Sequence, residues 1–167
     1  MRAGFQTPLR VEQVGFGWWR LTDELAYYSE MLDQVIVVPE GFCTDFASVP
    51  RLPLAFLLFG SRANAPAVIH DFAYRTGIIA RTTADRVFNE AMKSEGKTIF
   101  TRWPMTGAVL AFGGLVYRSR GGCLDYRGCS KRKPKAPRCE YCVNWYRDWQ
   151  KCLMTLEEYK GGGDAVS

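Results

Sequence analysis

His70 and Asp71 stand next to each other, and Tyr74 and Asp85 follow at spacings that suit one polar site. If residues 67–76 form a helix, His70 and Tyr74 lie on one face, while Asp71 points ~100° away from His70. A carboxylate that accepts a proton from one imidazole nitrogen makes the other nitrogen more basic, so that it can deprotonate water. His70, Asp85 and Tyr74 are therefore the candidate catalytic residues.

Asp85 begins an otherwise apolar stripe that Phe88 and Met92 continue along a second predicted helix. A carboxylate that faces a core needs a partner, because burying it alone is unfavourable. His70, on the preceding helix of the predicted antiparallel pair, is the expected partner. A buried His–Asp–Tyr network that only joins the two helices fits the same pattern, so the structural and the catalytic interpretations both stay open.

Asp71 is also a candidate ligand for a metal ion that polarises a substrate, and Asp45 in the preceding loop is a second candidate. Asp45 equally suits local hydrogen bonds that shape the loop. His70 is the only histidine, which excludes a site built from several histidines. Ser48 lacks the Gly-x-Ser-x-Gly elbow of a nucleophilic serine, and its place before Val-Pro favours a turn.

The strands and helices that the sequence predicts around these residues indicate an α+β fold. β-branched and aromatic residues at 24–29 and 34–38 indicate two strands of a hairpin or small antiparallel sheet, which we expect to pack on a three-helix C-terminal half. Capping and breaking residues place the helices at about 67–76, from 82 or 83 to 96, and at about 104–117. The third is apolar nearly all round, which is typical of a buried helix.

Composition divides the chain further. Its 167 residues, 47% of them hydrophobic, suit one domain with a core, predicted at 1–117. A basic Cys-rich appendage at 118–160 and a flexible tail at 161–167 complete the predicted organisation. Residues 118–152 hold ten Lys or Arg against three acidic residues, within a net charge of +5. Such a segment suits an acidic protein face, nucleic acid or lipid headgroups, although a solvated charged loop is the more common explanation.

We expect no signal peptide and no transmembrane segment, since no apolar run reaches the about 20 residues that a spanning helix needs.

Five cysteines of the appendage predict a metal site, because thiols clustered in a cytosolic product more often bind metal than form disulfides. Zinc is the expected metal, with iron–sulfur and disulfides as alternatives. Its predicted ligands are Cys123, Cys129, Cys139 and Cys142, with Cys152 as the alternative ligand. The neighbouring candidates for contact with nucleic acid or a partner are Lys131, Arg132, Lys133, Lys135 and Arg138.

Three strings resemble the signature of an uncharacterised protein family that is encoded mainly by tailed bacteriophages. They are VPEGFCTDFASVPR at 38–51, IHDFAYR at 69–75 and ADRVF at 84–88. The family pattern is P-x-G-F-x-T-D-F-A-S-V-P, then H-D-x-x-Y, then A-D-x-x-F, and all three parts stand here in order. The resemblance implies a phage origin and a gene product of the tail or lysis type.

The His-Asp-x-x-Tyr pattern with a distal Asp is also similar to that of secretory phospholipases of the A-two type. That resemblance implies His70 as the base, Asp71 as a calcium ligand, and Tyr74 and Asp85 as orienting groups. The cysteines that flank the His-Asp pair in those enzymes and their glycine-rich calcium loop are absent here.

We therefore expect a component of a tailed-phage virion, made in the host cytoplasm. It would be a tail-associated structural or accessory protein that retains a His-Asp hydrolytic site. Its expected partners are other tail or virion proteins, in multiple copies, and a host envelope component. One alternative is a metal-dependent hydrolase of lipid or cell wall, used when the phage enters or lyses its host. A small basic nucleic-acid-binding protein is the other alternative and is less favoured.

Overall fold

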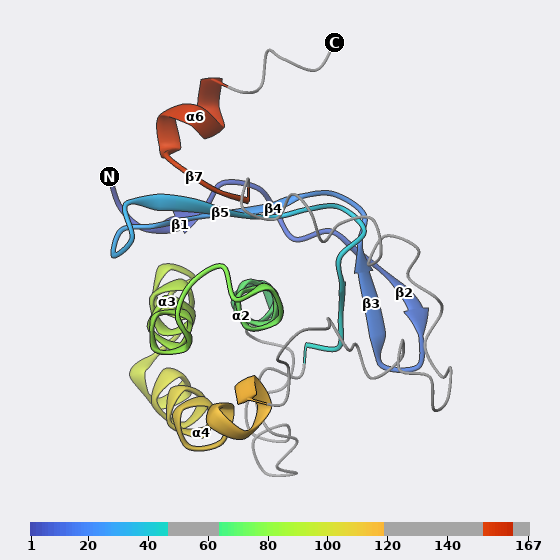
Figure 1. Cartoon of the computed structure of the whole chain (residues 1–167), viewed down its shortest axis with the longest axis vertical. Helices are drawn as coiled ribbons and strands as arrows, with labels where there is room; N and C mark the ends of the chain where they lie inside the picture. The colour runs from blue at the N-terminus through green and yellow to red at the C-terminus, as the bar shows by residue number, and fades with distance from the viewer. Residues whose placement is uncertain (47–63, 119–151, 162–167) are drawn as a thin grey trace.

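The computed structural model describes residues 1–46, 64–118 and 152–161. These residues form two small antiparallel sheets and four helices, which confirms the predicted α+β class (Figure 1). Helices α2 and α3 lie side by side against one face of the larger sheet, and α4 lies beyond them (Figure 1). Helix α6 lies on the opposite side of that sheet.

The larger sheet has the strand order β1-β4-β5-β7. Its centre is the predicted hairpin, in which Tyr27 pairs with Ile36 and Tyr28 with Val35. Asp33 turns the chain between these strands with a positive φ of 52°. The strand bounds are Gly4–Phe5 for β1, Leu25–Ser29 for β4, Gln34–Val38 for β5 and Leu153–Met154 for β7.

The smaller sheet has the order β2-β3-β6, with bounds Val11–Gly15, Trp18–Leu21 and Cys43–Thr44. Strand β6 reaches β3 through a turn in which Phe42 N donates to Pro39 O at 3.3 Å. Gly41 has a φ of 82° in this turn, a conformation that glycine adopts without the steric penalty of a Cβ. The turn thus carries the chain directly from β5 of one sheet to β6 of the other.

The helices run over Asn64–Thr76 (α2), Arg81–Ser94 (α3), Ile99–Arg118 (α4) and Leu156–Gly161 (α6). The first two follow the prediction closely. Gly77, the expected stop, has a φ of 65° and donates its N–H to Ala73 O at 2.9 Å. Helix α4 begins five residues before Pro104, where the prediction started it, and Pro104 lies inside the helix, where its missing N–H removes one helical hydrogen bond.

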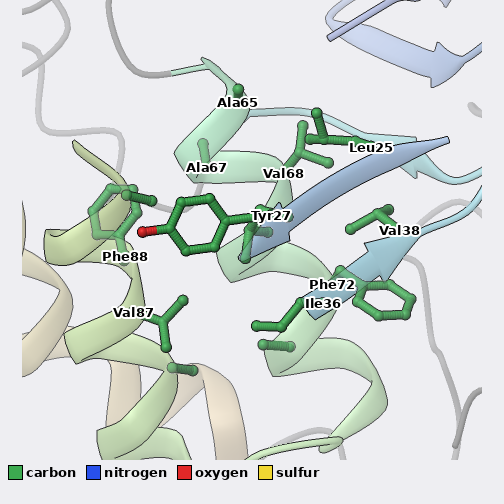
Figure 2. Packing of buried hydrophobic residues seen from close by; sticks show 14 of the residues in the cluster. Leu25, Tyr27, Ile36, Val38, Ala65, Ala67, Val68, Phe72, Val87 and Phe88 are labelled. Atoms are coloured by element: carbon green, nitrogen blue, oxygen red, sulfur yellow. The ribbon is translucent and has the colours of Figure 1, made fainter. Parts of the chain in front are cut away.

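The core lies between the larger sheet and the helix pair. Alternate residues of β4 and β5 point toward the helices, and Figure 2 shows Leu25, Tyr27, Ile36 and Val38 beside apolar side chains of α2 and α3. The fully buried helix residues Val68, Phe72, Val87 and Phe88 belong to this cluster. The burial of so many large side chains is the main force that holds α2 and α3 in place.

The outer face of the same sheet has a second, smaller cluster of Ala26, Tyr28, Val35 and Val37, against which Met154, Leu156 and Tyr159 pack. Tyr159 OH also donates to Glu24 Oε1 at 3.0 Å. The end of the expected appendage, residues 152–160, thus lies on the main sheet. The rest of the proposed division stays a prediction, since 119–151 and 162–167 lie outside the described residues.

Helix α4 differs from the expectation of a helix buried on all sides. Val109 is buried, but Leu110, within the predicted span, is 51% exposed, and Phe100 and Trp103, which precede that span, are 83% and 76% exposed. Among the described residues α4 packs mainly on α3, and one helix covers only one face of another. Among the helices of the described ranges, none combines the length and the hydropathy that crossing a membrane requires.

Candidate active site

The predicted polar centre forms between α2 and α3. His70 Nε2 lies 3.0 Å from Asp85 Oδ1, and Tyr74 OH donates to the same oxygen. His70 and Tyr74 are one helical turn apart on α2, so both reach Asp85 on α3, as their spacing predicts. An ionised carboxylate only accepts hydrogen bonds, so the neutral tautomer that fits this contact carries its proton on Nε2 and leaves Nδ1 as the acceptor.

The site is enclosed: the side chain of His70 is 2% exposed and that of Asp85 is 1% exposed. His70 Nδ1 and Asp85 Oδ2 are both buried and have no hydrogen-bond partner among the described residues. A buried acceptor without a donor costs about 1–3 kcal/mol. The two atoms are therefore acceptors whose hydrogen-bonding capacity the described residues leave unused.

Two rings fix the orientation of the imidazole. The ring of Tyr74 lies 4.1 Å from that of His70, and the ring of Phe88 lies 5.0 Å from it, measured between centroids. The imidazole therefore cannot turn over without displacing a buried aromatic neighbour. This packing favours the ring orientation in which Nε2 faces Asp85 and Nδ1 faces away from it.

Asp71 faces a different part of the fold from His70, as helical geometry requires. Thr44 Oγ1 donates to Asp71 Oδ2 at 2.7 Å, which joins β6 to α2. The second expected metal ligand, Asp45, lies close by, and Arg75 Nη2 stands between them, 3.6 Å from Asp71 Oδ2 and 3.9 Å from Asp45 Oδ1. The two carboxylates thus come together as expected, but around a guanidinium group.

This arrangement does not fit the calcium ion that the phospholipase resemblance implies. Calcium takes six to eight oxygen ligands, whereas here Arg75 already engages both carboxylates. Within 1–46, 64–118 and 152–161, no cluster of three or more His, Cys, Asp or Glu residues is placed to bind a metal. The flanking cysteines of the phospholipases have no counterpart in this site either.

Sequence reasoning missed Arg75. The sequence contains a pattern that indicates its role: Arg75 follows Asp71 by four residues, a spacing at which opposite charges pair on a helix. Arg75 Nη1 also donates to the backbone oxygen of Cys43 at 2.7 Å, a contact that no local pattern reveals.

A second cluster that the sequence did not single out joins α3 to the β4–β5 hairpin. Glu90 Oε2 accepts from Tyr27 OH at 3.1 Å and from Ser29 Oγ at 2.7 Å, and Oε1 accepts from Met31 N at 3.0 Å. Burial, and then the nearby charge of Glu90, raise the pKa of Tyr27 far above its usual value. Tyr27 is therefore a permanent donor, and we assign this cluster a structural role.

Ser48 lies outside the described residues. So do four predicted zinc ligands and the whole basic patch, namely Cys123, Cys129, Cys139, Cys142, Lys131, Arg132, Lys133, Lys135 and Arg138. Cys152, the alternative zinc ligand, is partly buried and packs against the main core.

The sequence model of DUF1353, a family of proteins of unknown function, matches residues 19–109, more than half of the chain. The chain belongs to the DUF1353 family. The match runs from β3 into α4, so the DUF1353 region contains His70, Tyr74 and Asp85 as well as the cluster around Arg75. Strands β1 and β7, helix α6 and the Cys-rich segment lie outside it. No curated protein and no solved structure matches the chain.

Proposed function

We propose that this DUF1353 protein is a tail-associated component of a tailed-phage particle and that it carries a hydrolytic site with His70 as its general base. The hydrolytic part rests on one observation: His70 Nε2 is bound to Asp85, while the buried Nδ1 has no partner among the described residues. The particle part rests on the resemblance of 38–51, 69–75 and 84–88 to the phage signature.

In the proposed reaction, a water molecule donates to Nδ1 of neutral His70. As the water oxygen attacks a carbonyl carbon or a phosphorus atom, its proton moves to Nδ1, and His70 becomes an imidazolium held by Asp85. The bond to the leaving group then breaks, and the imidazolium returns the proton to the leaving oxygen or nitrogen. Tyr74, which donates to Asp85 Oδ1, is a positioning residue in this scheme.

The rival interpretation is a network that only joins α2 to α3. It accounts for Nε2, Asp85 Oδ1 and Tyr74, but it leaves two buried acceptors unused, Nδ1 and Asp85 Oδ2. Buried polar groups in proteins nearly always have partners. A catalytic site gives Nδ1 a partner, the reacting water, and the proposal favours hydrolysis for this reason.

For the substrate, we propose an ester or amide of the host envelope, in lipid or cell wall, which the particle meets during infection or lysis. A dedicated hydrolase that acts outside the particle is the alternative with the same site. Nucleic-acid binding would depend on the basic residues 131–138, which lie outside the described residues, and no described contact favours it.

The decisive variant is His70→Gln. The Gln amide can still donate to Asp85 in place of Nε2–H, but it has no basic nitrogen in place of Nδ1. We expect this variant to fold and to lose hydrolysis of phospholipid vesicles or purified peptidoglycan by at least about 100-fold, the usual contribution of a general base. Arg86→Gln is the matched control, because Arg86 is exposed on α3 next to Asp85.

Full activity in a folded His70→Gln variant would show that the imidazole is structural. The particle part has a separate test, mass spectrometry of purified virions. The absence of the protein from them would contradict a virion role while leaving the hydrolytic site intact.

A further inference from the structure

The guanidinium group of Arg75 is enclosed by groups from two segments that are far apart in sequence. Its side chain is only 10% exposed, and Nη2 lies between the carboxylates of Asp71 and Asp45. Nη1 donates to the backbone oxygen of Cys43 at 2.7 Å, and the guanidinium carbon lies 5.3 Å from the centre of the Phe42 ring. Residues 42–45 thus surround a cation that helix α2 supplies.

The electrostatics of this position favour a single fixed cation. Arg75 lies in the last turn of α2, where the helix dipole favours positive charge. Thr44 Oγ1 donates to Asp71 Oδ2 as well, so that this carboxylate already has a hydrogen-bond donor besides Arg75. An added divalent ion would have to displace Arg75 from both carboxylates and from the Cys43 carbonyl, or else lie beside its positive charge.

We propose that Arg75 is the built-in cation of this carboxylate pair, so that Asp71 and Asp45 bind no calcium. Arg75 is then a positioning residue: it holds the turn at 42–45 against the helix that carries His70. One consequence rests on the proposed function, namely that hydrolysis at His70 needs no divalent ion at Asp71. The binding statement itself is independent of any activity.

The same contacts predict what the loss of Arg75 would create. Without the guanidinium, the carboxylate oxygens of Asp71 and Asp45 would lose the cation that both now contact. Oxygen donors of these kinds suit calcium. We therefore expect Arg75→Gln to gain calcium binding, and Arg75→Lys, which keeps the charge, not to gain it.

The test is a calcium titration of the full chain, measured by calorimetry, with terbium luminescence as a second probe. Wild type should show no calcium binding that the substitution Asp71→Asn abolishes. Addition of a chelator should leave the melting temperature of wild type unchanged, as it does that of Asp71→Asn. In Arg75→Gln, calcium should raise the melting temperature, and the added change Asp71→Asn should abolish that rise. Arg86→Gln, at an exposed position, is the control.

Saturable calcium binding by wild type that Asp71→Asn removes would overturn the proposal, even if Arg75→Gln does not fold. Because no substrate enters this titration, its result is separate from the test of hydrolysis. An inactive protein that binds no calcium at Asp71 would refute the proposed function alone. An active protein whose activity needs calcium bound at Asp71 would refute the role of Arg75 alone.

Discussion

His70 and Asp85 meet across the interface of α2 and α3, with Nε2 3.0 Å from Oδ1, and Tyr74 shares that carboxylate oxygen. Two donors from one helix thus converge on one acceptor from the next. The arrangement leaves two acceptors of the network, His70 Nδ1 and Asp85 Oδ2, without a partner among the described residues. Stability and activity should therefore depend differently on its members.

Asp85 holds two buried donors, so its removal should be more harmful to stability than that of any other member of the network. We expect Asp85→Ala to lower the free energy of unfolding by about 3 kcal/mol, since both His70 and Tyr74 lose their acceptor. Asp85→Asn keeps one carbonyl oxygen and should lose less. Urea denaturation measures both. A loss in Asp85→Ala no larger than in Arg86→Ala, at the exposed neighbouring position, would contradict the geometry.

Thr44 joins β6 to α2 through its hydroxyl, which donates to Asp71 Oδ2 and accepts from Phe46 N at 3.0 Å. Thr44→Val preserves the shape of the side chain but removes both bonds, so we expect a loss of about 1–3 kcal/mol. Thr82→Val, at an exposed position of α3, is the matched control and should change stability by less than about 0.5 kcal/mol. Equal unfolding midpoints for the two variants would argue against this junction.

Glu90 accepts three hydrogen bonds from the β4–β5 hairpin. We expect Glu90→Ala to lower the free energy of unfolding by about 2–3 kcal/mol, because several donors lose a charged acceptor together. Glu95→Ala is the control, since Glu95 only forms a partly exposed ion pair with Lys97. Hydrogen exchange at Met31 N should speed up in Glu90→Ala and not in Glu95→Ala. Unchanged hydrogen-exchange protection at Met31 N would argue against this link between α3 and the β4–β5 hairpin.

Tyr159 makes the attachment of α6 sensitive to alkaline pH. Burial, and then the hydrogen bond to Glu24, raise the pKa of Tyr159 from 10.0 to about 12. The folded state therefore keeps this proton at a pH where the unfolded state loses it. The stabilisation is complete below about pH 10 and disappears as the pH rises toward 12.

Tyr159→Phe removes this titration together with the hydrogen bond. The stability difference between wild type and this variant should be largest near neutral pH and should shrink above pH 10. Tyr27 and Tyr28 titrate in both proteins, so their effects cancel in the difference. Unfolding midpoints measured from pH 7 to 11 test this, and a difference that stays constant over the range would exclude the assigned role of Tyr159.

Helix α4 shows a limit of prediction from composition. Its apolar residues on all sides indicated burial, yet Leu110, within the predicted span, is 51% exposed in the described structure. Hydrophobicity indicates how much apolar surface of a helix would be buried favourably, but not how many neighbouring elements are present to cover it. The number of neighbours is a property of the assembled fold.

Local patterns by themselves determined the β4–β5 hairpin, the extents of α2 and α3, and the pairing of His70 with Asp85. Each depends on periodicity, on capping or on a short connection, and these are properties of neighbouring residues. Only the tertiary structure decided that Arg75 also contacts Asp45, and that residues 153–154 pair with β5. Those contacts join segments that are far apart along the chain, and packing of the whole domain, which no local pattern encodes, brings them together.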